Sequence, residues 1–196
     1  MAATLILASA SPRRRELLAQ SGLFFEVVAS DIPEVPAAGE SPEAFAQRVA
    51  REKALEVARQ RHSVHVLAAD TVVTIDGAIF GKPLDAGDAR RMLRALSGRT
   101  HRVLTAVALI DPRGHVEELL VATEVEFQPL TAAAIDDYLA TGEPFDKAGA
   151  YAVQGVAGKF VVQVRGSLSN VIGLPMEAVS ALLRRHFPPR GAESGA

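Results

Sequence analysis

The segment from Val64 to Ile75, VHVLAADTVVTI, is predominantly apolar and is followed by the dipeptide Asp76-Gly77. The next residues, Ala78–Phe80, are apolar again, and Asp-Gly between two such runs is a strong signal for a two-residue β-hairpin. This composition is typical of a strand that is buried on both faces of its sheet. The remaining chain therefore has to supply further strands and the helices that cover them.

Segments with strand and helix signals alternate along the rest of the chain. We expect strands at Leu5–Ala8, Phe24–Ala29, His101–Ile110, Glu117–Phe127 and Lys159–Arg165, the third and fourth joined at DPRG. Helices are predicted after the N-cap residues Ser11, Ser41, Asp85 and Thr131, with a last helix from about Pro175 to His186. This order predicts the α/β class, with a mixed central β-sheet flanked by helices. We expect one domain over residues 1–187, elongated into two lobes, and a disordered tail over residues 188–196.

Composition limits the class of protein. The formal net charge is −2, which argues against a dedicated duplex nucleic-acid binder. Cysteine is absent, so disulfides, thiol nucleophiles and cysteine-based metal sites are excluded. The run Leu5–Ala8 is too short for a signal peptide and no segment reaches transmembrane length, so we expect a cytoplasmic protein without membrane attachment.

Three consecutive arginines, Arg13–Arg15, fall in the first turn of the helix predicted after Ser11. A cation at this end of a helix opposes the dipole by about 0.3–1 kcal/mol. Free backbone N–H groups and guanidinium groups at one spot suit a polyanion such as a phosphate chain. The alternative is that these arginines are solvated surface residues, screened by salt and by Glu16.

Asp70 interrupts the apolar run and is the strongest single candidate for chemistry. A carboxylate in such surroundings has to be paired with a cation, bind a metal or stay protonated. The alternative is that it caps backbone N–H groups at the end of a strand. The apolar residues on both sides make this alternative less favourable, so we favour a functional role.

Three further charged residues are weaker candidates. Lys53 falls inside the apolar arc of the helix after Ser41, where it either snorkels to water or points into a cleft that holds something negative. Lys82 is presented by the stiff sequence GKP just after the hairpin, although a solvated loop lysine is the common alternative. Glu34, in the proline-rich loop, is a candidate second carboxylate beside Asp70 for a hard cation.

Several common site patterns are missing. The histidines lack zinc-ligand spacing such as HExxH, and the segment GAYAVQGVAG matches neither a Walker A loop nor GxGxxG. Ser9 and Ser11 lie outside any GxSxG sequence, so ordinary serine-nucleophile hydrolysis is disfavoured.

Six segments together resemble the Maf nucleotide pyrophosphatases in order and spacing: LILASASPRRRELL, AADTVV, GKP, SGRTHRVLT, DKAGAYAVQG and GSLSNVIGLP. The resemblance extends from about Leu5 to Pro175. Thr71 after the aspartate and Gln154 in DKAGAYAVQG resemble the branch of that family that acts on dTTP and UTP. The family's fold, similar to that of the inosine triphosphatases, implies a deep cleft between two lobes, and its members commonly form homodimers.

The resemblance also implies roles for residues. Asp70 would be the proton acceptor and, with Glu34, would hold a divalent cation, Mg²⁺ or Mn²⁺. The phosphates would be bound by Ser9, Arg13, Arg14, Lys53 and Lys82. The choice of base would depend on Arg13, Thr71 and Gln154.

The predicted function is hydrolysis of dTTP and UTP to the monophosphate and pyrophosphate, with modified pyrimidine triphosphates as further candidate substrates. The alternative is a nucleotide-binding regulator of septum formation with little hydrolysis, an association that the family also carries. A pyrophosphatase of the inosine-triphosphate type ranks last, because that group lacks the SPRR segment.

Overall fold

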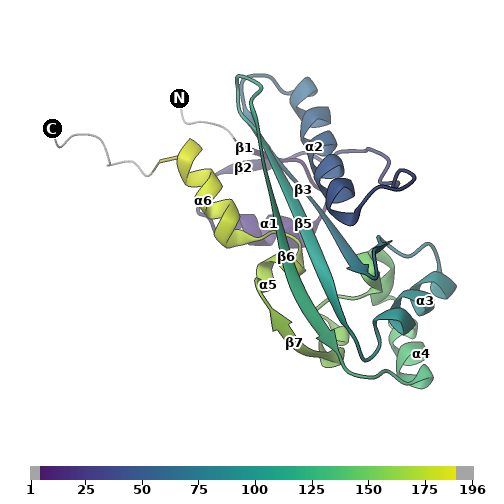
Figure 1. The fold of residues 1–196 in the computed structure, drawn as a ribbon. Helices are drawn as coiled ribbons and strands as arrows, with labels where there is room; N and C mark the ends of the chain where they lie inside the picture. Colours follow the sequence, from purple (N-terminus) through teal and green to yellow (C-terminus); the bar gives the residue numbers. More distant parts are fainter. Residues whose placement is uncertain (1–4, 189–196) are drawn as a thin grey trace.

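The computed structural model describes residues 5–188, and within them a single mixed sheet forms the centre of the molecule (Figure 1). Its strand order is β2-β1-β3-β5-β6-β7, with β4 paired to β3 outside this path. The strands are β1 (Leu5–Leu7), β2 (Phe25–Val27), β3 (His65–Ile75), β4 (Ala78–Phe80), β5 (Thr100–Ile110), β6 (Val116–Phe127) and β7 (Val161–Arg165). The pairs β1–β2 and β1–β3 are parallel and the others antiparallel, which confirms the predicted mixed sheet.

Apart from α5, the helices begin where the sequence predicts them. They are α1 (Pro12–Ala19), α2 (Pro42–Gln60), α3 (Ala86–Leu96), α4 (Ala132–Ala140), α5 (Leu168–Ile172) and α6 (Met176–His186). Each predicted N-cap side chain, of Ser11, Ser41, Asp85 and Thr131, accepts a hydrogen bond from the backbone N–H three residues further on. None of these helices is long and apolar enough to span a membrane.

Three features differ from the sequence prediction. Helix α5 was not expected. Three short 3₁₀ helices were also missed: η1 (Glu143–Asp146), η2 (Ala148–Ala150) and η3 (Val156–Phe160). Because η3 extends through Phe160, β7 begins at Val161 rather than at Lys159. The predicted tail, residues 188–196, lies outside the described residues except for Pro188.

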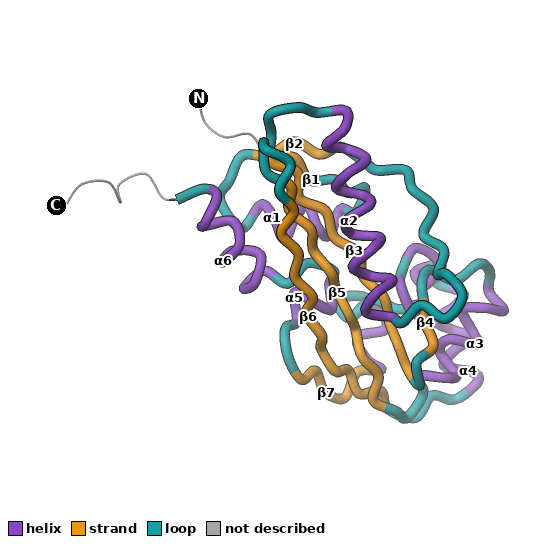
Figure 2. Tube along the Cα trace, turned by 45° about the horizontal axis from the view of Figure 1, so that its top comes forward, coloured by secondary structure: helices purple, strands orange, loops and turns teal. Residues whose placement is uncertain are grey.

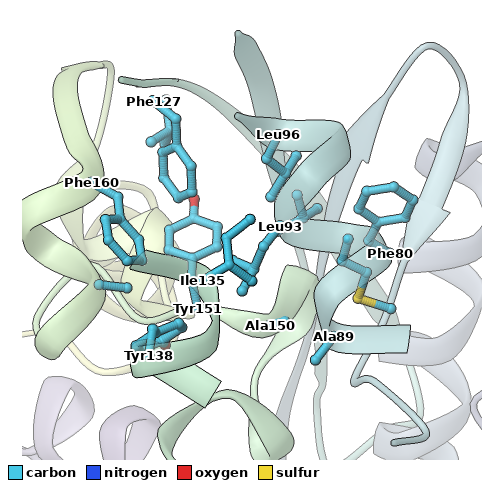
Figure 3. Close-up of a cluster of buried hydrophobic side chains, with 14 of the residues drawn as sticks. Phe80, Ala89, Leu93, Leu96, Phe127, Ile135, Tyr138, Ala150, Tyr151 and Phe160 are labelled. Atoms are coloured by element: carbon cyan, nitrogen blue, oxygen red, sulfur yellow. The ribbon is translucent and has the colours of Figure 1, made fainter. Parts of the chain in front are cut away.

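The side chains of β3 alternate between the two faces of the sheet. Ala68 and Val72 pack with α2, which lies along one face (Figure 2). Leu67 and Val73 point to the opposite face, where Leu67 packs in the cluster that holds α1 and α6, and Val73 in the cluster that holds α3 and α4. In the latter cluster Phe127 packs edge-on against Tyr151 and Phe160, with ring centroids 4.8 and 6.2 Å apart (Figure 3).

A polar belt separates these two apolar clusters on the face opposite α2. It consists of Thr71, Thr105 and Thr123 on neighbouring strands and Asn170 on α5. The Asn170 amide nitrogen donates to Val103 O at 3.0 Å and to Thr123 Oγ1 at 2.9 Å, which fastens α5 to the sheet. The belt divides the core on this face into two parts.

The free energy of unfolding should depend on pH because of a buried histidine, His101. Burial lowers the pKa of His101 from 6.5 to about 4, so this ring stays neutral in the folded protein while it is protonated in the unfolded chain. Between these pH values the unfolded chain binds more protons, so stability falls as the pH is lowered from 6.5 towards 4, by up to roughly 3 kcal/mol.

Urea denaturation across this pH range measures the effect. His101→Gln should reduce the dependence on pH without abolishing it, because burial, followed by the neighbouring charge of His186, also lowers the pKa of His65. The exposed His62 provides the control, and His62→Gln should retain the wild-type dependence. Equal curves for the two variants would contradict the assignment to His101.

Candidate active site

The site begins with an opening in the edge of β3. Strand β1 pairs with residues 65–67 and β4 pairs with residues 73–75, while β5 occupies the other edge over residues 66–74. Because β1 and β4 share one edge, the stretch of β3 between them has no strand partner there among residues 5–188. A cavity of about 820 Å³ lies at this opening. Asp70 and Thr71 are therefore placed at its wall by strand pairing alone.

The cavity brings together every residue that the sequence assigned to the site. Its lining includes Ser9, Arg13, Arg14, Glu34, Lys53, Asp70, Thr71, Lys82 and Gln154. The third arginine of the first turn, Arg15, is exposed and does not line the cavity. The positive charge at the start of α1 thus enters the cleft through Arg13 and Arg14.

Asp70 is paired with a cation rather than capping a strand end. The Lys53 ammonium donates to Asp70 Oδ1 at 2.8 Å and lies 2.7 Å from Glu34 Oε1. Asp70 is 3 % exposed and Lys53 6 %, whereas the Glu34 side chain is 42 % exposed. Burial alone would raise the pKa of Glu34, but the charge and hydrogen bond of Lys53, together with the charges of Lys82 and Arg14, hold that pKa below its ordinary value. Lys53 thus points into the cleft and joins two carboxylates from different segments.

Arg14 is held in a fixed orientation on the other side of the cleft. Its Nε donates to Gly173 O at 2.9 Å, and its terminal nitrogens donate to Thr71 Oγ1 at 3.0 Å and to Ser9 Oγ at 3.5 Å. Burial lowers the pKa of Arg14, while the charges of Asp70 and Glu34 oppose that shift. A guanidinium has more N–H donors than these three contacts use, so Arg14 retains donors for an anion.

The hydroxyl groups of Thr71 and Thr105 lie behind Arg14, and the donor and acceptor in each of their hydrogen bonds can be assigned. Thr105 Oγ1 donates to Asn170 O at 3.0 Å, which uses its only proton. The contact of 3.0 Å between Thr71 Oγ1 and Thr105 Oγ1 is then donated by Thr71, whose oxygen in turn accepts from Arg14. The chain of bonds from Arg14 to Asn170 therefore runs in one direction and fixes the Thr71 side chain.

The other candidates are less constrained. Arg13 lies 3.7 Å from the carboxylate of Asp146, and Lys82 is exposed and forms no ion pair with residues 5–188. Gln154 is exposed at the cavity wall, on a turn between Tyr151 and η3. These side chains are available for a ligand.

Sequence reasoning missed several residues that support the site. Gly173 O and Thr105 orient the Arg14–Thr71 pair, and Lys147 lines the cavity with its ammonium on Asp146 and on Glu143 O. All three residues lie in segments that the resemblance already contained: Lys147 in DKAGAYAVQG, Gly173 in GSLSNVIGLP and Thr105 in SGRTHRVLT. A lysine beside an aspartate in a glycine-rich segment was a usable signal, whereas Thr105 looks like an ordinary strand threonine.

The two carboxylates on Lys53 fit a divalent cation of the magnesium type. No cluster of three or more His, Cys, Asp or Glu side chains occurs among the described residues. Asp70 and Glu34 each use one oxygen on Lys53, which leaves the second oxygen of each for another partner. A pair of carboxylates suffices for Mg²⁺ when phosphate oxygens and water complete its shell.

Solved structures support the class of fold. The Ham1 protein of Staphylococcus aureus matches with a TM-score of 0.57 at 13% identity, over 93% of this chain and 99% of that one. A HAM1 protein from Coxiella burnetii matches with a TM-score of 0.51 at 18% identity, over the same shares. Fold and site together define a protein of the Ham1 type of architecture, with a cation-lined cleft around one buried carboxylate.

The chain belongs to the Maf family, since the family described as Maf-like protein matches residues 4–186. It is 56% identical over 188 residues to a dTTP/UTP pyrophosphatase of Anaeromyxobacter dehalogenans, covering 94% of this chain and 95% of that protein. It is 54% identical to a dTTP/UTP pyrophosphatase of Myxococcus xanthus, covering 92% and 91%.

Replacing Lys53 should destabilise the fold, because Asp70 would be left buried without its cation. We expect Lys53→Met to lower the unfolding free energy by about 3 kcal/mol, the lower end for a broken buried pair because the cleft admits water. The double variant Lys53→Met/Asp70→Asn should regain part of that loss. Urea denaturation measures both.

Lys82→Met serves as the control, since Lys82 lines the same cavity but is exposed and unpaired among residues 5–188. Its unfolding free energy should stay within about 0.5 kcal/mol of wild type. Equal losses for the two lysine variants would contradict the structural role of the Lys53 ion pair.

Proposed function

We propose that this protein hydrolyses dTTP and UTP, and modified pyrimidine triphosphates of the same shape, to the monophosphate and pyrophosphate. The observation that carries the proposal is the buried Asp70 carboxylate, held by Lys53 at the wall of a cleft lined with further cations. The names of relatives about half identical along most of the chain support the same substrates.

The cations of the cleft suit a triphosphate chain. Arg13 and Arg14 approach from the start of α1, Lys53 from α2 and Lys82 from the loop after β4. Each charge-assisted hydrogen bond to a phosphate oxygen is worth about 1.5–3 kcal/mol. Ser9, whose hydroxyl lies against Arg14, would add a neutral donor to the same phosphates.

In the proposed reaction Asp70 acts as general base on a water molecule. The water oxygen forms a bond to the α-phosphorus while its proton passes to an Asp70 carboxylate oxygen. The bond from the α-phosphorus to the bridging oxygen breaks, and that oxygen leaves with pyrophosphate. Lys53 holds the Asp70 carboxylate in place, and the arginines and Lys82 stabilise the negative charge that develops on the leaving group.

Asp70 and Glu34 would hold a divalent cation, Mg²⁺ or Mn²⁺, together with phosphate oxygens. Such a cation, when bound, screens the phosphate charge and lowers the pKa of water. The ion pair with Lys53 keeps both carboxylates oriented towards the cleft.

Base recognition is proposed for Gln154, Thr71 and Arg13. The Gln154 side chain offers a donor and an acceptor, which complement the edge of a pyrimidine ring. Thr71, oriented by Arg14 and Thr105, lies at a fixed place in the wall of the same cleft.

The proposal also covers the oligomeric state, the cellular compartment and nucleic-acid binding. We propose a homodimer that acts on free nucleotides in the cytoplasm and does not bind duplex nucleic acid. The nucleotide substrate and the net charge of −2 support the last two points. A regulator that only binds nucleotides would have no use for a buried base, which is why hydrolysis is favoured.

Replacing the base should remove turnover while leaving the fold intact. We expect Asp70→Asn to lower the rate on dTTP and UTP at least roughly 100-fold, because general-base action contributes about 10²–10⁴-fold. The assay incubates each protein with a panel of nucleoside triphosphates and Mg²⁺ or Mn²⁺, and separates pyrophosphate from orthophosphate.

Circular dichroism provides the fold control for this variant. Wild-type protein should release pyrophosphate from dTTP and UTP. Release of orthophosphate alone would instead indicate a phosphatase, and no release of either would favour the nucleotide-binding regulator. A variant with wild-type rates would overturn the role of Asp70.

The role of Gln154 is tested separately through selectivity. Gln154→Ala should reduce the preference for dTTP and UTP over purine triphosphates by roughly tenfold, about the effect of one hydrogen bond. The ratio of kcat/KM values across the panel measures the preference. A uniform loss for all nucleotides would contradict a role in base selection.

A further inference from the structure

Gln154 is carried by a tight turn at the wall of the cavity. Gly155 N donates to Ala152 O at 3.1 Å, so the turn spans Ala152–Gly155 with Gln154 at its third position. The helix η3 starts directly after it at Val156, and the N-cap residue Gly155 has no side chain to satisfy the first N–H groups. The position of the Gln154 side chain therefore depends on what holds the far end of this turn.

The carboxylate of Glu143 holds that end. Its Oε2 accepts from Val156 N at 2.8 Å, and its Oε1 lies 3.5 Å from Ala157 N. Glu143 thus caps η3 from another segment of the chain, as an acidic residue at the start of a helix commonly does.

The same carboxylate is anchored in the core. The hydroxyl of Tyr138, a fully buried residue of α4, donates to Glu143 Oε1 at 2.9 Å, and Tyr138 packs against Phe160 (Figure 3). Burial and the nearby carboxylate raise the pKa of Tyr138, so its hydroxyl remains a donor. Glu143 therefore connects the buried side of α4 to the turn that carries Gln154.

Gly155 fits this carboxylate closely. A Cβ atom at Gly155 would lie 2.3 Å from Glu143 Oε1 and 2.5 Å from Oε2. The backbone of Gly155, with φ −101° and ψ −158°, lies outside the left-handed region and is open to other residues. A larger residue here would therefore displace the Glu143 carboxylate from its place on the turn.

We propose that Glu143 is a positioning residue for nucleotide selection, which fixes the turn of Gln154 through Val156 while Gly155 gives its carboxylate room. Glu143 does not need to touch the nucleotide itself. This inference rests on the proposed function, because it assigns the selectivity of that same site to a residue behind it.

A double-mutant cycle between Glu143 and Gln154 tests the inference. Glu143→Gln keeps the shape but presents an amide that accepts fewer hydrogen bonds from the turn. We expect it to lower the dTTP to dGTP ratio of kcat/KM by roughly tenfold, mainly through KM for dTTP. In a Gln154→Ala background the same substitution should leave the ratio unchanged, because the two residues act as one unit.

Gly155→Ala provides a second variant that keeps Glu143. Its added methyl group should displace the carboxylate and reproduce the selectivity loss of Glu143→Gln. In a Glu143→Ala background the obstacle is gone, so Gly155→Ala should then change the ratio less than twofold. Thermal unfolding of each variant shows whether it is folded at the temperature of the assay.

Two results would overturn the inference. One is an equal loss of kcat/KM for dTTP and dGTP in Glu143→Gln, which is what a merely structural role would give. The other is a selectivity loss of the same size in the Gln154→Ala background. Calorimetry of dTTP and dGTP binding to these variants in an Asp70→Asn background measures the same selectivity without turnover. Failure of the proposed hydrolysis and failure of this inference therefore remain distinguishable.

Discussion

The ion pair between Lys53 and Asp70 is the interaction on which the site depends. A carboxylate on the interior of β3 and an ammonium on the inner side of α2 would each be unfavourable in this environment alone. Placed 2.8 Å apart they compensate one another, and both lie at the wall of an open cleft. The same ammonium binds Glu34, so one lysine determines where two acidic groups point.

Lys53 also organises the loop between β2 and α2. Glu34 fastens that loop from the cleft side, and Arg48 of the same helix binds Glu40 and Val35 O further along it. Asp31 N donates to Glu56 one turn beyond Lys53. The loop is therefore tied to α2 at several points and forms a fixed wall of the cavity.

The cleft itself follows from strand pairing. Because β1 and β4 occupy the same edge of β3, the interval between them opens the sheet. Successive residues of β3 point to opposite faces, so Asp70 meets α2 while Thr71 meets Arg14 and the polar belt. One break in one strand edge thus brings groups from both faces of the sheet into a single site.

Much of this arrangement could be predicted from local sequence signals. The N-caps at Ser11, Ser41, Asp85 and Thr131 are short-range features, and so is the Asp-Gly hairpin. Lys53 could be singled out because a charged residue falls inside the apolar arc of its helix, although the sequence left open whether it reaches water or the cleft.

The parts that were missed depend on contacts between distant segments. Helix α5 is too short to show a helical period, and its role comes from Asn170 bonding to β5 and β6. Thr105 gains its role only because Thr71 lies opposite it in the sheet. Glu143 lies just before the segment DKAGAYAVQG. Its carboxylate nevertheless caps Val156 in another 3₁₀ helix, and no periodic pattern in the sequence indicates this contact.

Hydrolysis of dTTP in ¹⁸O-labelled water, followed by mass analysis of both products, tests directly whether water attacks the α-phosphorus beside Asp70. Attack of water on the α-phosphorus, next to Asp70, predicts that the label enters the nucleoside monophosphate and that pyrophosphate stays unlabelled. Label in pyrophosphate or in orthophosphate would show attack at another phosphorus and would contradict the proposed geometry of the site.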